Sequence, residues 1–236
     1  DKDVIDTELQ LKDIETLEKR LDKIQKAAKT GDKAAKATFD LGQRMLAHLG
    51  DGNNARSLDL TEEEALEIKE FQLLTGKPIL YVCNVDEDSA VSGNEYSAAI
   101  KELVAAENAQ VVIISAGIEA DIAELETKEE RLEFLEAIGL SEPGVNKIIS
   151  AAYRLLGLIT YFTAGEKEVR AWTITEGTKA PGAAGVIHTD FEKGFIRAEV
   201  IAYEDFISYG SEAAVKEAGK MGVEGKEYIV RDGDIM

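Results

Sequence analysis

The chain has 236 residues, of which 44% are hydrophobic and 31% charged, so it is long enough to bury a substantial globular core. We expect no membrane span and no secretion leader, because no apolar stretch reaches the roughly 18 to 20 residues that a spanning helix needs. The formal net charge of −19 argues against broad nonspecific affinity for nucleic acid. The one cysteine, Cys83, cannot form an internal disulfide, and no Cys/His cluster has metal-ligand spacing. A reducing, cytoplasmic location is therefore expected.

Two helices joined by a short turn are predicted over residues 1–56. In the first, over residues 6–29, apolar residues three or four apart form one stripe: Leu11, Ile14, Leu17, Leu21 and Ile24. "TGD" at 30–32 interrupts this pattern. A second stripe then runs to "GDGNN" at 50–54, through Ala35, Phe39, Leu46 and Leu49. The pattern is typical of an antiparallel helical hairpin with coiled-coil-like spacing.

The tip of this predicted hairpin is strongly basic, although the chain as a whole is acidic. Between residues 19 and 36, seven basic residues against two acidic ones give a net charge of +5. The basic residues are Lys19, Arg20, Lys23, Lys26, Lys29, Lys33 and Lys36. They form either a solvated helix face or a salt-dependent contact with RNA phosphates. Aromatic residues are absent from 12 to 38, which argues against stacking on single-stranded bases.

Residues 57–156 alternate between helix and strand patterns. Thr61 and Glu64 form a capping box for a helix that is predicted to end at Gly76. The continuous apolar runs "PILYVCN" (78–84) and "AQVVIISA" (109–116) predict two strands buried on both faces of a parallel sheet. Further helices are predicted over 94–108 and, after a Ser141 cap, over 143–156. This order is that of a doubly wound α/β domain, whose ligands meet the carboxyl ends of the strands.

Residues 157–236 change to short strands with one or two helices. "LITYFTAG" and "EVRAWTI" flank the turn-like "GEK" (165–167), which predicts a β-hairpin, and "FIRAEVIAY" (195–203) predicts another strand. We expect a small α+β domain of ubiquitin-like size. Because residue 1 is not Met and the chain stops just after a turn at Asp232-Gly233, we also expect a portion of a longer protein.

Polar and small residues follow both of the predicted parallel strands. Asn84 and Glu87 come after the first strand, and Ser115, Ala116 and Gly117 come at the end of the second. In nucleotide-binding α/β domains these two segments form the base pocket: an Asn joins them, an acid reads the base edge, and Ser-Ala supplies backbone groups. Asn and acidic residues are also common turn residues after any strand, so the spacing alone leaves both readings open.

Several long segments together resemble the YchF-type Obg-like ATPases, and the likeness covers essentially the whole chain. They are "YVCNVDE", "ISAGIEAD", "VRAWTITEGTKAPGAAGVIHTDFEKGFIRAEVIAYEDF" and "VEGKEYIVRDGDIM". The resemblance implies a P-loop NTPase domain with a coiled-coil insertion over 1–56, its C-terminal part over 57–156, and a TGS domain with a β-grasp fold over 157–236. It also implies an ATP- and Mg²⁺-using NTPase of the translation-factor class, with ribosomes or RNA as partners.

The base-reading motif departs from the Asn-Lys-x-Asp that most of that NTPase class carries, in which Asp accepts two hydrogen bonds from guanine. Here it reads Asn84-Val85-Asp86-Glu87. The extra methylene of Glu87 displaces the carboxylate, and a mispaired buried polar group costs about 1–3 kcal/mol, enough to remove a strong guanine preference. The resemblance implies a preference for ATP, with adenine read largely through the backbone near Val85. Asp86 is expected to be a solvated turn residue.

The sequence contains no phosphate loop of the form G-x-x-x-x-G-K-[ST]. The nearest segment, "TGDKAAKAT" (30–38), lacks the first Gly at the required spacing and lies in the predicted hairpin. We therefore expect no catalytic residue, no metal ligand and no ATP hydrolysis by this chain alone. Two functions remain: part of an ATPase that controls docking on the ribosome, or a non-catalytic RNA or ribosome adaptor. His48 is expected at a helix end, and His188 in a structural or surface role.

Overall fold

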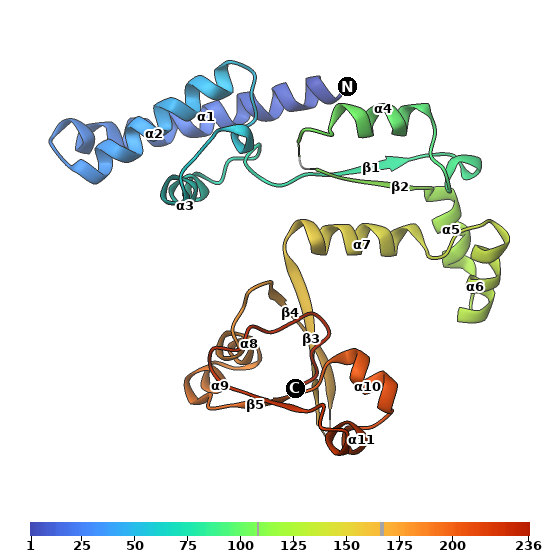
Figure 1. Ribbon diagram of the computed structural model, residues 1–236. Coiled ribbons are helices and arrows are strands. Elements are labelled where there is room, and N and C mark those ends of the chain that lie inside the picture. The colour runs from blue at the N-terminus through green and yellow to red at the C-terminus, as the bar shows by residue number, and fades with distance from the viewer. Residues whose placement is uncertain (108, 166–167) are drawn as a thin grey trace. The chain divides into compact units, whose positions relative to one another are not determined.

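The computed structural model describes residues 1–107, 109–165 and 168–236. Asn108, at the end of one predicted helix, and Glu166 and Lys167 of the predicted "GEK" turn lie outside the described residues. The chain forms two compact units (Figure 1). The first holds Asp1–Ile79 and Ala99–Ala109, and the second holds Leu80–Ala98 and Gln110–Met236. The division at 56 and 156 does not coincide with these limits and stays a prediction.

The first unit is built on a helical hairpin. Helices α1 (Lys2–Lys29) and α2 (Lys33–Gly50) pack side by side (Figure 1). Asp32 caps α2, since its carboxylate accepts hydrogen bonds from the N–H groups of Ala34 and Ala35 at 3.0 and 3.1 Å. The two helices and the break at "TGD" are thus confirmed, whereas coiled-coil geometry stays a prediction.

The buried face of this hairpin differs from the predicted stripe. Leu17 and Leu21 are buried on α1, but Leu11 is 62% exposed. The polar residues Gln10 and Asp13 are buried on α1 as well. The prediction counted apolar side chains alone, and it missed polar groups whose burial is compensated by hydrogen bonds. On α2 the buried residues are Leu41, Gly42, Met45 and Leu49.

Asp13 joins three segments of the first unit. Its carboxylate is 1% exposed and accepts hydrogen bonds from Leu74 N at 2.6 Å, Thr75 N at 2.7 Å and Thr75 Oγ1 at 2.7 Å. Thr75 Oγ1 in turn accepts from the N–H of Ala55, in the 3-10 turn η1 (Ala55–Ser57), at 3.0 Å. One buried carboxylate therefore holds α1 against the segment after α3 and against η1.

Helix α3 (Glu62–Phe71) begins at the predicted capping box. Thr61 Oγ1 accepts from Glu64 N at 3.3 Å, and the Glu64 carboxylate accepts from Thr61 N at 3.0 Å. The helix ends before the predicted Gly76 because Gln72 adopts a left-handed conformation with φ of 54°. The chain then turns inward and buries Leu73 and Thr75.

The second unit contains the two predicted parallel strands. β1 (Leu80–Asn84) pairs in parallel with β2 (Gln110–Ile114), so that Asn84 lies beside Ile114. The strands and their direction are confirmed, but burial of β1 on both faces is wrong, since Val82 is 43% exposed. Within the described residues this sheet has two strands, and Val82 and Asn84 on one face of β1 are exposed.

The helices of residues 94–156 depart from prediction in number and length. Helix α4 stops at Leu103 rather than near residue 108, because Ala105 N and Glu107 N bond to carbonyls three residues back instead of four. Two helices occupy a region for which the sequence had predicted none. The second of them opens on a Thr127–Glu130 capping box, a signal that could have revealed it. The helices are α4 (Glu95–Leu103), α5 (Ala116–Glu124), α6 (Lys128–Ala137) and α7 (Gly144–Leu155), with a 3-10 turn η2 (Glu87–Ser89).

Residues 158–236 form an α+β region around an antiparallel hairpin. The predicted hairpin is confirmed as β3 (Leu158–Ala164) and β4 (Val169–Thr175). β5 (Ala198–Val200) and β6 (Gly222–Glu224) complete the named strands, and β5 is shorter than "FIRAEVIAY" predicted, as Ile196 is 79% exposed. The described residues contain four helices here instead of one or two: α8 (Ala180–Ile187), α9 (Thr189–Gly194), α10 (Tyr203–Tyr209) and α11 (Glu212–Glu217).

Tyr161 lies at the centre of this region. It is fully buried, and its hydroxyl donates to the carbonyl of Ala183 at 2.8 Å. Burial raises the pKa of Tyr161 to about 12. The same side chain thus links the hairpin to α8.

None of the helices in the part of the chain that the structure describes is long and apolar enough to cross a membrane.

Gly42 allows α1 and α2 to approach closely, and we predict that Gly42→Ala destabilises the protein. A Cβ at position 42 would lie 2.4 Å from Cδ2 of the buried Leu21. We expect the overpacking to cost about 1–3 kcal/mol, more than the roughly 1 kcal/mol gained in helix propensity. Gly50→Ala is the control, because a Cβ there meets open space. In urea denaturation, the midpoint concentration of urea should fall for the Gly42 variant only. Equal midpoints for the two variants would contradict the prediction.

Candidate nucleotide-base site

Asn84 joins the carboxyl ends of β1 and β2. Its Oδ1 accepts a hydrogen bond from Ala116 N at 2.9 Å, and the N–H of the next residue, Val85, donates to the carbonyl of Ile114 at 2.9 Å. Both bonds continue the pairing of the strands past their last residues. The carboxyl edge of a parallel sheet is where α/β domains bind ligands, so these bonds define the geometry of the candidate site.

The segment from Ser115 to Gly117 begins a helix, so the predicted strand "AQVVIISA" was extended two residues too far. Ser115 is buried and stands at the N-cap of α5, while Ala116 and Gly117 form the first turn. Ser is a common N-cap residue, a signal that sequence reasoning passed over. The first turn of a helix has N–H groups without intrahelical acceptors, and it carries a partial positive charge. The segment therefore offers hydrogen-bond donors at the strand ends.

Glu87 brings a carboxylate to the same place. It is exposed, and a Cβ on Gly117 would lie 3.0 Å from its Oε1, so the two residues are close neighbours. Asp86 accepts from Ser89 N at 2.9 Å and caps η2, so this exposed residue also has a structural role. All six residues predicted for base binding lie together at this edge: Asn84, Val85, Glu87, Ser115, Ala116 and Gly117. Whether they bind a base stays a prediction.

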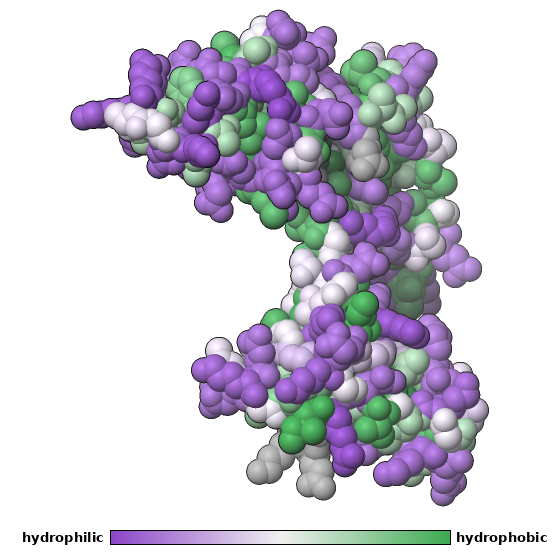
Figure 2. Space-filling view, turned by 60° about the vertical axis from the view of Figure 1, so that its left-hand side comes forward, coloured by the Kyte–Doolittle hydropathy of each residue, from purple (hydrophilic) through white to green (hydrophobic). Residues whose placement is uncertain are grey.

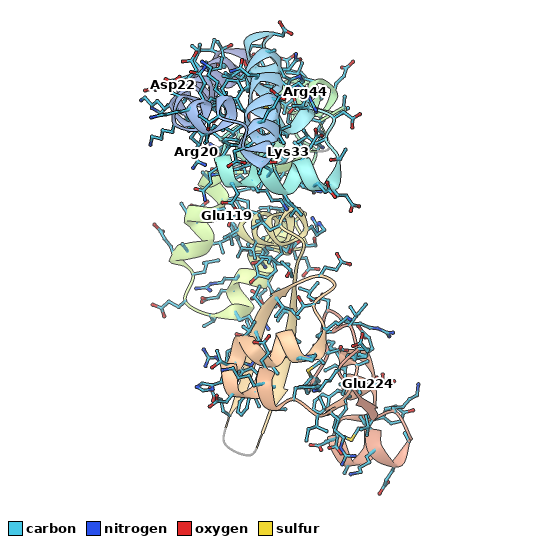
Figure 3. The ribbon with its side chains drawn as sticks, turned by 90° about the vertical axis from the view of Figure 1, so that its left-hand side faces the viewer. Arg20, Asp22, Lys33, Arg44, Glu119 and Glu224 are labelled. Atoms are coloured by element: carbon cyan, nitrogen blue, oxygen red, sulfur yellow. The ribbon has the colours of Figure 1, made fainter. Side chains whose placement is uncertain are left out.

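Glu119 positions the helices behind this site. It lies on α5, and its carboxylate accepts hydrogen bonds from Gly144 N at 2.6 Å and Val145 N at 3.2 Å, at the start of α7 (Figure 3). The predicted Ser141 cap is wrong, since the N-cap is Pro143, which has no side-chain cap bond. Sequence reasoning missed Glu119 because this acceptor comes from a distant segment, where no local pattern marks it.

We predict that Glu119→Ala lowers the free energy of unfolding by about 1–2 kcal/mol, the usual value of a helix cap. Ser141→Ala is the matched control and should change it by no more than about 0.5 kcal/mol. Thermal unfolding compares the two, and hydrogen exchange at the amides of Gly144 and Val145 should speed up only in the Glu119 variant. Equal exchange in both variants would show that α7 does not depend on this cap.

The predicted basic cluster divides into two groups. Lys19 pairs with Glu15, and hydrogen bonds from Lys12 and Lys19 lower the pKa of Glu15 to about 2. The Arg20 guanidinium lies 5.6 Å from the ring centroid of Phe71, so it packs against α3. The other five side chains are exposed and form no ion pair with a described residue: Lys23, Lys26, Lys29, Lys33 and Lys36. Figure 3 labels Lys33, and the upper left of Figure 2, where the first unit lies, is mostly hydrophilic.

The histidines have structural surroundings. His48 lies in the last turn of α2, with Nε2 2.8 Å from Ser57 Oγ. Nδ1 of His188 accepts from Asp190 N at 3.2 Å and caps α9. Within the described ranges no group of three or more His, Cys, Asp or Glu side chains could hold a metal ion.

Comparisons with known proteins agree over the whole chain. A family model named YchF-GTPase_C, described as a protein of unknown function (DUF933), matches residues 158–236. The "Ribosome-binding ATPase YchF" of Escherichia coli O157:H7 is 53% identical over all 236 residues, and that of Bacillus subtilis (strain 168) is 51% identical over 238 aligned positions. The structure of the Schizosaccharomyces pombe YchF GTPase superposes with a TM-score of 0.87 at 36% identity, covering 100% of this chain and 64% of that one.

Sequence and fold agree, and they relate this chain of mixed helix and strand content to a class of proteins that are named ATPases or GTPases. More narrowly, the chain is strongly homologous along its whole length to the YchF proteins, and the resemblance inferred from the sequence is confirmed. The chain spans 64% of the E. coli relative and 65% of the B. subtilis relative. The activity and partners of the whole protein therefore belong to the proposals that follow.

Proposed function

We propose that this chain contains the base-recognition and ribosome-attachment parts of a cytoplasmic, ATP-binding and ATP-hydrolysing NTPase that acts in translation. The observation that supports this proposal best is that Asn84, Glu87 and the first turn of α5 lie together at the carboxyl ends of two parallel strands. The printed names of the relatives, which call them ribosome-binding ATPases, support the same function. The chain alone does not hydrolyse ATP, because its sequence has no phosphate loop.

Each residue of the base site has a proposed role. The N–H of Val85 is already bonded to Ile114 O, so its carbonyl is the group that accepts from the amino group of adenine. Asn84 holds the two strand ends at a fixed separation, and the N–H groups at the start of α5 face the base. Glu87 excludes the guanine geometry that an aspartate would accept. Contacts to the phosphates and to Mg²⁺ come from outside these 236 residues.

This base site predicts a change of nucleotide preference. Replacing Val85 by Lys and Glu87 by Asp restores the residues that read guanine, and should shift the ATP/GTP affinity ratio about tenfold toward GTP, equivalent to about 1.4 kcal/mol. The ratio is measured by fluorescent nucleotide competition in a protein of the relatives' full length. Asp88→Asn, at the exposed neighbouring position, is the control and should leave the ratio unchanged. An unchanged ratio in the double variant would refute this account of the site.

Attachment to the ribosome is proposed to use the hairpin tip, with residues 157–236, a proposed TGS domain of β-grasp fold, as a second surface. The tip projects the five exposed lysines named above, while Lys19 pairs with Glu15 on its own helix and Arg20 packs against Phe71. Point charges of this kind suit RNA phosphates, whose binding needs no base reading. Residues 1–56 would then act as a coiled-coil insertion of a P-loop NTPase domain that continues over 57–156.

We predict that reversing Lys23, Lys26, Lys29 and Lys33 to Glu weakens ribosome or RNA binding. Loss of four phosphate contacts should reduce the slope of log K against log[salt] by about 3, from roughly 0.7 to 0.9 per contact. The control reverses four exposed lysines that lie outside both proposed surfaces and have no described ion pair: Lys69, Lys77, Lys101 and Lys128. Both variants change net charge equally. Equal cosedimentation of the two variants with ribosomes would show that the tip is a solvated surface without a role in binding.

The exposed tip also favours a second function, that of a non-catalytic RNA or ribosome adaptor. In this case the bound nucleotide controls the conformation of the adaptor. The two functions differ in turnover. In a protein of full length, ATP hydrolysis stimulated by ribosomes supports the enzyme. Nucleotide-dependent ribosome affinity without stimulated hydrolysis establishes the adaptor instead.

A further inference from the structure

Strand β4 has an outward-facing edge. Its pairing with β3 is unbroken over seven residue pairs, from Leu158↔Thr175 to Ala164↔Val169. Just beyond the ladder, Gly165 N donates to Glu168 O at 3.0 Å and Glu176 N donates to Gly157 O at 2.7 Å. In an antiparallel ladder, hydrogen-bonded and non-hydrogen-bonded pairs alternate. These end bonds therefore direct the N–H and C=O groups of β4 away from β3 at four positions: Val169, Ala171, Thr173 and Thr175. The Thr175 carbonyl accepts from Thr178 N at 3.1 Å, so only the first three positions offer both groups to a partner strand.

These outward groups have no neighbouring strand. On its other side β3 is bonded to the chain end, since Phe162 N donates to Asp234 O at 2.7 Å and Met236 N donates to Phe162 O at 2.8 Å. β3 is thus internal and β4 is the edge. Among the described residues, no second strand pairs with β4. The side chain of Thr173 contacts Tyr153 OH at 3.2 Å, but this contact leaves the backbone of β4 unpaired.

The edge lacks the features by which proteins usually block strand addition. Such features are prolines, bulges and charged side chains along the strand. β4 has no proline and no bulge, and its only charged residue is Arg170. The Arg170 guanidinium lies 4.1 Å from the ring centroid of Trp172, so it is folded onto its own strand. Val169 is 72% exposed, and the strand is rich in β-branched residues that favour extended structure.

The charges at the two ends of β4 select the kind of strand that fits. Glu168 and Glu176 flank the strand and are exposed. In a symmetric antiparallel pairing with a second copy centred on Trp172, Glu168 of each chain would face Glu176 of the other, and like charges placed opposite are unfavourable. A strand with basic residues eight positions apart, around a β-branched middle, would instead pair with both carboxylates.

We propose that β4 binds an extended, basic segment of a partner protein by strand addition. The partner supplies backbone groups to Val169, Ala171 and Thr173, and Lys or Arg side chains to Glu168 and Glu176. The proposal is independent of nucleotide binding and of the lysines at the hairpin tip. It assigns to residues 158–236 a protein-binding edge of defined length and charge.

The test uses the whole chain and two nine-residue peptides with blocked ends. One has the sequence Lys-Thr-Val-Thr-Thr-Thr-Val-Thr-Lys, and the other has Glu in place of both lysines. The lysine peptide should slow hydrogen exchange at the amides of Val169, Ala171 and Thr173 by at least tenfold. Arg170 and Trp172 are already bonded to β3, so their exchange should change little. Unchanged exchange at the three outward amides would overturn the proposal.

Two variants separate the backbone and charge contributions. Ala171→Pro removes one outward N–H without removing a bond to β3, and should weaken peptide binding at least tenfold, while Ala171→Val keeps the N–H and should still bind. The double variant Glu168→Lys with Glu176→Lys should reverse the preference, so that the glutamate peptide binds more tightly. An unchanged preference would overturn the role of the two carboxylates. Sedimentation of the chain alone that shows a dimer broken by Ala171→Pro would make a second copy the occupant instead.

Discussion

Backbone N–H groups at the ends of helices and strands need acceptors, and in this protein side chains from distant segments supply them. Asp13 accepts from the segment after α3, Asn84 accepts from the first turn of α5, and Glu119 accepts from the first turn of α7. Each bond joins two elements that the chain separates by many residues. The arrangement of the elements within each unit depends on these few oxygen atoms, because a buried N–H without a partner is costly.

The same constraint shapes the candidate site. Asn84 Oδ1 already accepts a hydrogen bond from the backbone of α5, and the N–H of Val85 already donates one to β2. What remains for a ligand is therefore mostly backbone carbonyl and N–H groups, together with the carboxylate of Glu87. A site of this composition suits the proposed base reader, which would distinguish bases by the direction of donors and acceptors and in which one methylene of an acidic side chain would alter specificity.

Charge is distributed unevenly over the molecule. The residues next to each charged side chain determine whether that side chain is available to a partner. Lys19 and Arg20 are engaged within the first unit, by Glu15 and Phe71, whereas the lysines nearer the hairpin turn are solvated. On β4 the Arg170 guanidinium packs against the ring of Trp172. Exposed acidic residues, Glu168 and Glu176, stand at the two ends of this open edge. A basic tip and an acid-flanked strand edge suit partners of opposite charge, nucleic acid phosphate at the one and a basic extended segment at the other.

The sequence by itself determined the local elements: the hairpin and its break at Gly31, the capping box at Thr61, the two parallel strands and the β3–β4 hairpin. Each depends on hydrophobic period or turn chemistry within a few residues. It also brought the base-site residues to one edge, since parallel strands end on the same side. Only the tertiary structure decided that Asp13 is buried while Leu11 is exposed, and that Glu119 rather than Ser141 caps α7. Those outcomes depend on which distant N–H groups lack an acceptor, and no local pattern records them.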